Sequence, residues 1–252
     1  MFEFAAITDI GPKFSANDDR ILINERIIAD GSIDGKIDNT FLIMAVADGV
    51  GGLQMGYEAA TISLQSLSDL NKPGLSRVDI RRVVEVANKN IIHRQDELDN
   101  TNGLRTTLAA LYISDNVCYV INAGDSRVYR YRENILEQLS KDHSIVQNMI
   151  DTGEITVEES YSHPKRNVIT KCLGEEEKVN ARIVDYTDDI KANDIFVLCS
   201  DGISDCLWDS EIASIVAENE LSLQDICKKL LCKAIDNGST DNISICLVRK
   251  EN

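Results

Sequence analysis

Several aspartates of this chain stand where apolar, strand-like runs end or begin. Asp48 directly follows the apolar run 41–47, and Asp201 follows the run 195–199 after a single serine. Asp241 comes shortly before another such run. Carboxylates at the rim of a core are costly when they are unpaired, and they repel one another when they gather. A divalent cation removes both costs, and ligands made only of oxygen suit Mg²⁺, Mn²⁺ or Ca²⁺.

Other aspartates could join such a metal site or could simply form turns. Asp125 lies in a short turn between two strand-like runs, and Asp18 and Asp19 stand together near the start of the sequence. The pairs 30–31 and 34–35 are both Asp-Gly. This dipeptide is ordinary turn chemistry, so we expect both pairs in a polar loop.

The glycine-rich loop after Asp48 has a second interpretation, a phosphate cradle. A strand, a glycine loop and a helix build many phosphate sites, and Gly51 and Gly56 have the spacing of a P-loop. A P-loop continues with Lys and then Ser or Thr, whereas this chain has Tyr57 and Glu58. The carboxylates on both sides would repel a bare phosphate, which favours a cation. A serine-based hydrolase is disfavoured because the sequence has no GxSxG motif.

The composition fits a folded globular protein of one large domain or two small ones, with 252 residues, 43% of them apolar. A net charge of −16 argues against nucleic acid or an anionic membrane as a partner. No apolar run approaches the roughly 18 residues of a membrane span, and the first residues lack the basic flank of a signal peptide. The 7 cysteines form no CxxC pair, so we expect reduced core thiols in a cytoplasm, among them Cys118, Cys199 and Cys246.

Helical segments are marked by apolar stripes and by capping residues. Ser76 and Asp79 are spaced as a capping box ahead of an apolar stripe. Gly153 is typical of the residue that follows a helix, and Ser222 with Asp225 marks another helix start. Helices are therefore predicted over 57–70, 78–95, 144–151, 210–218 and 222–235.

Strand-like runs are grouped rather than alternating with helices. Between residues 107 and 140 they are separated by turns too short for the crossover that parallel strands need, so neighbouring strands must be antiparallel. This grouping favours an α+β fold with antiparallel sheets over a doubly wound fold. The predicted strands are 3–7, 41–47, 107–113, 117–123, 127–132, 135–139, 181–185, 195–199 and 243–248.

Motifs in order along nearly the whole chain resemble those of one family, the metal-dependent protein serine/threonine phosphatases (PPM, or type 2C), in its compact bacterial branch. Each motif alone is weak, but the complete series at sensible distances is specific. The motifs are TDIGPKFSANDD (8–19), VADGVGG (46–52), TTLAAL (106–111), NAGDSRVYR (122–130), LSKDHSIV (139–146), VLCSDGISD (197–205) and STDNIS (239–244). HPKRNVITKCLG (163–174) is similar to the end of the variable flap of this family.

The resemblance implies a four-layer α-β-β-α sandwich, in which two antiparallel sheets pack face to face and helix pairs flank them. Residues 1–252 would form a single phosphatase catalytic domain. A variable flap would lie at about residues 144–175.

The resemblance also implies a centre of two cations, Mn²⁺ or Mg²⁺, in a cleft at one end of the sandwich. Asp48 would bridge the two ions, with the Gly49 carbonyl on one of them, and Asp201 and Asp241 would complete the other. These three aspartates would be the catalytic residues. No side chain need attack the phosphorus, because water held between two cations loses a proton near neutral pH.

Three further aspartates complete the implied ligand set. Asp18, at a position where the family usually has Glu, or Asp19 would hold metal-bound water. Asp125, together with Asp201, matches the site of a third ion in bacterial members. The implied metal ligands are Asp18, Asp19, Asp48, Gly49, Asp125, Asp201 and Asp241.

The sequence departs from the family where the substrate phosphate is held. Family members usually carry Arg three residues after the glycine that matches Gly11, whereas this chain has Phe14 with Lys13 beside it. Phe14 could be a loop residue that packs on the core. Arg105 could be a solvated surface charge, or it could reach the cleft and replace the missing Arg. Lys13 and Arg105 are therefore the candidate phosphate-binding residues.

The function implied by the resemblance is Mg²⁺- or Mn²⁺-dependent hydrolysis of phosphoserine and phosphothreonine in proteins. The enzyme would be a monomer in the cytoplasm that opposes a serine/threonine kinase. One alternative is a catalytically impaired regulatory or phosphoprotein-binding domain with the same fold, suggested by Phe14 and Asp18. Another is a relative that dephosphorylates one specific regulator.

Overall fold

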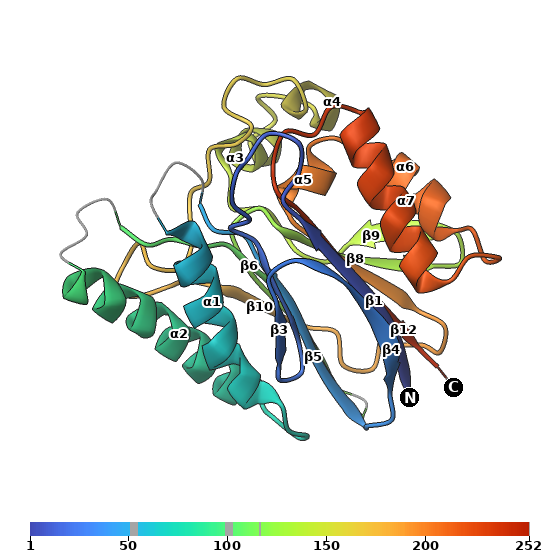
Figure 1. Ribbon diagram of the computed structural model, residues 1–252, viewed down its shortest axis with the longest axis horizontal. Coiled ribbons are helices and arrows are strands. Elements are labelled where there is room, and N and C mark those ends of the chain that lie inside the picture. The colour runs from blue at the N-terminus through green and yellow to red at the C-terminus, as the bar shows by residue number, and fades with distance from the viewer. Residues whose placement is uncertain (51–54, 99–102, 116, 252) are drawn as a thin grey trace.

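The computed structural model describes residues 1–50, 55–98, 103–115 and 117–251. Two of the glycines in the loop after Asp48, Gly51 and Gly52, and the turn residue Asn116 lie outside the described residues. The described residues form two antiparallel sheets packed face to face, with helices on both outer faces (Figure 1). The expected α+β sandwich with four layers is confirmed.

Each sheet has six strands, and all the pairings between them are antiparallel. The first sheet has the order β4 (Gly31–Ile37), β1 (Phe2–Asp9), β12 (Ile243–Lys250), β11 (Ile195–Cys199), β8 (Arg127–Arg132) and β9 (Ile135–Gln138). The second sheet has the order β10 (Arg182–Asp185), β7 (Val117–Ala123), β6 (Leu108–Ser114), β5 (Phe41–Ala47), β2 (Arg20–Ile23) and β3 (Arg26–Ile28).

The sequence of strand β5 is apolar throughout because both faces of the strand are buried. Alternate side chains, such as Leu42 and Met44, point into the core between the two sheets. The side chains in between, such as Ile43 and Ala45, pack under the helices that cover the second sheet. A strand buried on both faces has no polar positions to spare. Its first polar residue, Asp48, can therefore stand only beyond the strand's end.

Helices cover the outer face of each sheet. The second sheet is covered by α1 (Gly56–Leu67), which continues as a short 3-10 turn (Ser68–Leu70), and by α2 (Arg77–Glu97). Helices α6 (Asp209–Val216) and α7 (Leu223–Asp236) pack on the first sheet. The capping box of Ser76 and Asp79 is present at the start of α2, where the Asp79 amide lies 3.3 Å from the Ser76 hydroxyl.

The expectation of a polar loop around the two Asp-Gly pairs is wrong. Residues Gly31–Ile37 form β4, an edge strand that pairs with β1 along its whole length. An edge strand with a solvent-facing side can carry polar residues, and Gly35 lies against the ring of Phe4 with no room to spare. The short strands β2 and β3 also escaped prediction, because runs of three or four residues carry little periodic signal.

Residues 144–175 form a segment at one end of the sandwich, with two short helices, α3 (Ile145–Asp151) and α4 (Val157–Ser160). The predicted glycine after α3, Gly153, has a positive φ of 75°. Figure 1 places this segment, α5 (Asp201–Ser204) and the blue loop 10–18 at the same end of the molecule, away from the two chain ends. This end carries the carboxylates singled out by the sequence.

The prediction of core thiols holds for five of the 7 cysteines, whereas Cys206 is partly exposed and Cys232 is exposed. All 7 are free thiols, and Cys118, Cys199 and Cys246 are buried in strands. Burial raises the pKa of the Cys118 and Cys199 thiols to about 12, so both are protonated and inert near neutral pH. Among the described helices, none combines the length and the apolar character that crossing a membrane requires.

Candidate metal centre

Aspartates from segments far apart in the chain meet at one end of the sandwich. Asp48 follows β5, Asp201 is the first residue of α5, and Asp241 stands just before β12. Burial raises the pKa of Asp48 well above its usual value, and neighbouring negative charges raise it further. Those charges belong to Asp19, Asp201, Asp125 and Asp241. The structure thus brings together the carboxylates that the sequence proposed as metal ligands.

Two of these carboxylates carry buried oxygens that lack a hydrogen-bond partner among the described residues. Asp19 is 1% exposed, and its Oδ2 accepts a hydrogen bond of 2.8 Å from Ser200, but its Oδ1 has no partner. Burial is the main reason that the pKa of Asp19 is raised to about 6. Asp201 Oδ1 is likewise buried and unpartnered. Buried acceptors without partners are destabilising, and a cation is the partner that also relieves their repulsion.

The backbone around Asp48 is fixed by the neighbouring strand. The Asp48 carbonyl accepts hydrogen bonds of 2.8 Å from both the Thr107 amide and the Thr106 hydroxyl. The Asp48 amide in turn donates to the Thr107 hydroxyl at 3.0 Å. A ligand whose main chain is held at both polar atoms keeps its position when the surrounding charges change.

Gly49 packs so tightly against the start of α1 that no side chain fits. A Cβ atom on Gly49 would lie 2.4 Å from the carbonyl carbon of Gly56. On the other side of this contact, the amide of Tyr57 donates to Asp18 Oδ1 at 3.2 Å. Glycine at position 49 therefore allows the loop after β5 and the carboxylate of Asp18 to meet at the first turn of α1.

Asn242 anchors the loop next to the cluster, a role that sequence reasoning missed. Its Oδ1 accepts a hydrogen bond of 2.8 Å from the Asp18 amide, and its Nδ2 donates to the carbonyls of Ile10 and Ala16 at 2.7 and 3.2 Å. Its own amide donates to the Asp241 carboxylate at 2.8 Å. One side chain thus fixes loop 10–18 beside β12. Its position directly after Asp241 was the available signal.

Asp125 lies in the turn between β7 and β8, below segment 144–175. Burial, followed by the charges of Asp142 and Asp205, raises the pKa of Asp125 to about 7. The turn is held by His143, whose Nδ1 accepts a hydrogen bond of 3.2 Å from the Gly124 amide. Burial lowers the pKa of His143 to about 4, so the ring is neutral near pH 7 and Nδ1 is free to accept.

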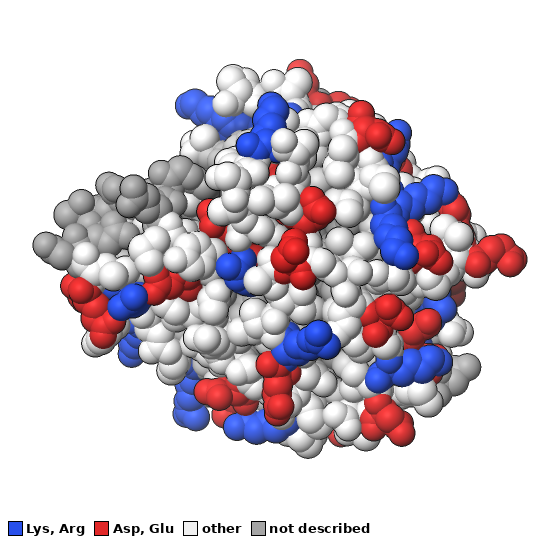
Figure 2. Space-filling model, in the orientation of Figure 1, with Lys and Arg blue, Asp and Glu red and all other residues white. Residues whose placement is uncertain are grey.

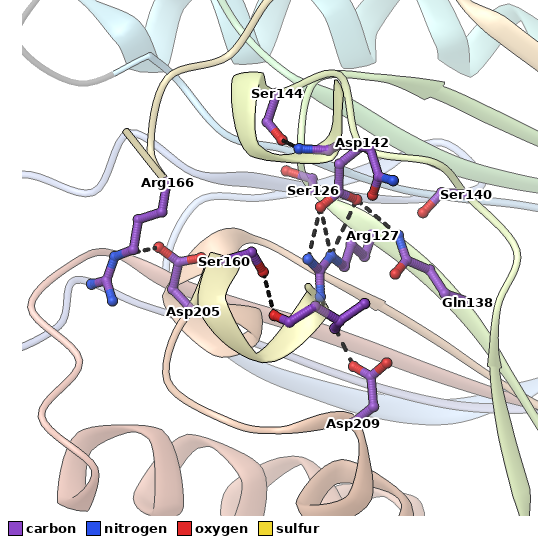
Figure 3. A network of polar contacts seen from close by, with 12 residues as sticks. Ser126, Arg127, Gln138, Ser140, Asp142, Ser144, Ser160, Arg166, Asp205 and Asp209 are labelled. Atoms are coloured by element: carbon purple, nitrogen blue, oxygen red, sulfur yellow. Dashed lines mark hydrogen bonds and ion pairs between the residues drawn. The ribbon is translucent and has the colours of Figure 1, made fainter. Parts of the chain in front are cut away.

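A polar cavity of about 30 Å³ separates Asp125 and Asp201 from segment 144–175. It is large enough for a water molecule. Figure 3 shows its wall, where Arg127 makes a bidentate ion pair with Asp142, the closest distance being 2.7 Å. A larger groove of about 620 Å³ lies elsewhere, along α2 and residues 177–180, and none of the proposed metal ligands lines it.

Segment 144–175 is docked on the body of the protein beside this cavity. Arg166 reaches Asp205 across 3.6 Å, as Figure 3 shows, and the rings of Tyr161 and Trp208 have centroids 3.9 Å apart. These contacts link the segment to α5 and to the start of α6. The wall of the cavity is therefore made partly by segment 144–175 and partly by the body of the protein.

The candidate phosphate-binding residues lie in different settings. Lys13 and Phe14 are exposed in loop 10–18, and the 50% exposure of Phe14 contradicts the idea that it packs on the core. Arg105 forms an ion pair of 3.3 Å with Glu175. Its carbonyl accepts a hydrogen bond of 3.0 Å from the Val50 amide, which places the Arg105 backbone next to the loop after Asp48.

The surface agrees with the acidic composition. Figure 2 shows Asp and Glu interspersed with Lys and Arg over the face that it presents.

Among the described residues, no group of three or more His, Cys, Asp or Glu side chains is close enough to enclose a metal ion. The aspartates are near enough to raise one another's pKa but leave room between them. Ligands made only of oxygen suit cations such as Mg²⁺, which also keep several water ligands.

Comparison with known proteins gives consistent matches. The sequence pattern of the family described as Protein phosphatase 2C matches residues 32–235. The serine/threonine phosphatase stp of Listeria monocytogenes is 30% identical over 230 residues, which cover 88% of this chain and 89% of that protein.

Solved structures match over the whole fold. The serine/threonine phosphatase Stp1 from Staphylococcus aureus has a TM-score of 0.87 at 26% identity, covering 100% of this chain and 96% of that one. The catalytic domain of the serine/threonine protein phosphatase PstP, solved in complex with 2 manganese ions, has a TM-score of 0.80 at 25% identity. That match covers 100% of both chains.

The raised carboxyl pKa values predict how the metal-free protein responds to pH. The folded state holds protons on Asp19 up to about pH 6 and on Asp125 up to about pH 7, against an ordinary value of 3.8. The raised carboxyls outnumber His143, whose lowered pKa acts in the opposite direction, so the folded state binds more protons than the unfolded state in this window. The free energy of unfolding should therefore fall as pH rises through it. Denaturant unfolding in the presence of a chelator, at a series of pH values across this window, measures the slope.

Asp125→Asn is the matched control for this prediction. Its side chain cannot ionise, so the metal-free variant should lose less stability than the wild type over the same pH window. Equal slopes for the two proteins, or a stability that rises with pH in the wild type, would contradict the assignment of buried, mutually repelling carboxylates.

Proposed function

The chain belongs to the protein phosphatase 2C family, and on that premise we propose how its residues divide the work of the reaction. The protein is a metal-dependent protein serine/threonine phosphatase, which hydrolyses phosphoserine and phosphothreonine in phosphorylated proteins. The observation that carries the proposal is the cluster of buried aspartates with unpartnered oxygens at Asp19 and Asp201. A catalytically impaired domain would have no need to keep this costly cluster intact.

We propose that Asp48, the Gly49 carbonyl, Asp201 and Asp241 would hold two cations, with Asp48 as the ligand that both ions would share. When bound, the cations activate a water molecule at neutral pH and neutralise charge on the phosphate oxygens during an in-line displacement. The role of the chain is to hold these ligands still. Asp48 is fixed through its main chain by Thr106 and Thr107, and Asp241 is oriented by the Asn242 amide.

Asp18 and Asp19 form the outer part of the proposed site. Asp18 ends loop 10–18, which Asn242 fixes in place, and Asp19 follows it directly before β2. Asp18 accepts from the Tyr57 amide with one oxygen, and Asp19 accepts from Ser200 with one oxygen. Each keeps acceptor capacity to orient water. Asp125, together with Asp201, would hold a third ion under segment 144–175.

We propose Mn²⁺ or Mg²⁺ as the physiological cation, because the ligands are all oxygen. The whole chain would act as one catalytic domain, with segment 144–175 as its flap. The enzyme would work as a monomer against a serine/threonine kinase. A cytoplasmic location is supported by the 7 free cysteines.

The substrate phosphate also needs cationic side chains, and Lys13 and Arg105 are the proposed ones. Lys13 is exposed next to Phe14 in the loop that carries Asp18. Arg105 would have to leave Glu175, from which it is 3.3 Å distant, in order to reach a phosphate. Lys13 is exposed, and the ion pair of Arg105 with Glu175 is partly exposed, so breaking that pair costs little.

The test of the proposed function is turnover of a phosphothreonine peptide with and without Mn²⁺. Removal of metal should abolish turnover and should also lower thermal stability, because the carboxylates then repel one another. Asp201→Asn is the control that keeps the shape of a ligand and removes its charge. Full activity in a chelated sample would rule out the metal-dependent mechanism.

Asp48→Asn tests the bridging ligand. It removes a charge shared by both proposed ions, and we expect turnover to fall at least ~10²-fold, by analogy with the loss of one transition-state stabiliser. The fold should survive, because the hydrogen bonds at position 48 involve the main chain. Steady-state kinetics with a melting curve check both points, and near-normal turnover in the folded variant would refute the assignment.

Phe14→Arg tests the phosphate grip. A guanidinium binds a phosphate already present in the ground state, so KM should fall more than kcat rises. A charge-assisted hydrogen bond contributes roughly 1.5–3 kcal/mol, which allows a gain of about tenfold. Because Phe14 is 50% exposed, the melting temperature should not change. Phe14→Ala removes the ring without adding a donor and should leave KM unchanged; a KM that is the same in the Arg variant would place the grip elsewhere.

A further inference from the structure

The second sheet continues beyond β5 and β6 as an irregular ladder of three segments. Gly49 pairs with Thr106, and Thr106 pairs with Leu173 on its other side. The Leu173 amide donates to the Thr106 carbonyl at 2.9 Å, and the Thr106 amide donates to the Leu173 carbonyl at 3.2 Å. Residues 104–107 therefore link the loop that carries Asp48 and Gly49 to the end of segment 144–175 through backbone hydrogen bonds.

Asn88 of α2 holds the far side of this ladder. It is 1% exposed, its Oδ1 accepts a hydrogen bond of 2.8 Å from the Gly174 amide, and its Nδ2 donates to the Glu176 carbonyl at 2.8 Å. Both the oxygen and the nitrogen of the side-chain amide are thus hydrogen-bonded to main-chain atoms of residues 174 and 176, just after Leu173. A buried amide is tolerated only when it is hydrogen-bonded, so this pairing specifies where the segment ends.

Gln95, two turns further along α2, joins two segments of the ladder. Its Nε2 donates to the carbonyls of Leu104 and Gly174, each at 2.7 Å. The two segments approach closely at this point, because a Cβ on Gly174 would lie 2.1 Å from the Leu104 carbonyl oxygen. Gly174 also has a φ of +86°, which glycine adopts without strain. The side chain of Gln95 therefore sets the spacing between residue 104 and residue 174.

We propose that Asn88 and Gln95 are positioning residues for the phosphatase reaction, which hold Asp48 and Gly49 in place through residues 104–107. The last link is the pair of hydrogen bonds that the Asp48 carbonyl accepts from Thr106 and Thr107, both 2.8 Å. The inference rests on the proposed function, because it takes Asp48 and Gly49 as metal ligands. Its new content is that the outer helix α2 tunes metal affinity.

Packing alone does not account for the two amides. Helix α2 already packs on the second sheet through Ile80, Val84, Ala87 and Ile91, all of which are buried. An apolar residue at position 88 would extend that stripe without a desolvation cost. The two side-chain amides instead hydrogen-bond to specific carbonyl and amide groups at the base of segment 144–175. Such contacts fix the position of that backbone.

The experiment compares Asn88→Leu and Gln95→Leu with the wild type. Calorimetric titration with Mn²⁺ should show binding weakened about tenfold, the scale on which the loss of supporting hydrogen bonds acts on metal sites. The Mn²⁺ concentration for half-maximal turnover of a phosphothreonine peptide should rise by the same factor. At saturating Mn²⁺, kcat should stay within about twofold of the wild type, because the ligands themselves are intact.

Two controls on the same helix separate positioning from stability. Val84→Ala removes a buried contact and should lower the melting temperature while Mn²⁺ binding stays unchanged. Asn90→Ala removes an amide that donates to Ser66 at 3.1 Å, away from the ladder, and should also leave Mn²⁺ binding unchanged. Gln95 is less buried than Asn88, so Gln95→Leu serves if Asn88→Leu does not fold.

The outcomes distinguish this inference from the function on which it rests. Variants that melt earlier but bind Mn²⁺ as tightly as Val84→Ala would overturn the positioning role and leave the phosphatase assignment in place. A wild type that binds Mn²⁺ but does not hydrolyse the phosphothreonine peptide would contradict the proposed function. In that case a weaker calorimetric affinity in both Leu variants would still support the link from α2 to the metal site.

Discussion

Repulsion among carboxylates buried at one end of the sandwich is the constraint on which the rest of the structure depends. Asp48 and Asp201 are both held where burial and neighbouring charges oppose their ionisation. A fold keeps such groups together only if their main chains cannot move apart. Strand ends meet this requirement, because the hydrogen bonds of the sheet fix the backbone up to the last residue. Bound cations would relieve this repulsion, and that relief would contribute to the free energy of metal binding.

The two sheets contribute to this centre in different ways. The second sheet supplies Asp48 at the end of β5, and the first sheet supplies Asp201 and Asp241 at the ends of β11 and β12. Loop 10–18 closes the site, fixed by the contacts of Asn242 to Ile10, Ala16 and Asp18. The face-to-face packing of the sheets is thus what sets the separation of the proposed metal ligands.

Segment 144–175 is held to the rest of the molecule at its base and beside the cavity. At its base, Leu173 pairs with Thr106 in the ladder, next to the side-chain amides of Asn88 and Gln95 on α2. Near its middle, Arg166 pairs with the partly buried Asp205, and the ring of Tyr161 packs against that of Trp208. The segment is therefore attached to the body of the protein both at its base and beside the cavity near Asp125.

The sequence by itself determined most of the antiparallel strands and the capped helices, because periodicity and capping residues are local signals. It also singled out the aspartates of the proposed site, through the order of the motifs along the chain. Strand β5 and the Ser76–Asp79 capping box were predictable from such local signals. The edge strand β4 was not, since its polar residues are acceptable only beside β1. The exposure of Phe14, the anchoring role of Asn242 and the contacts of Asn88 and Gln95 were decided by tertiary structure alone. Each depends on backbone groups that are distant in sequence, and their spacing arises only when the sheets and α2 have packed.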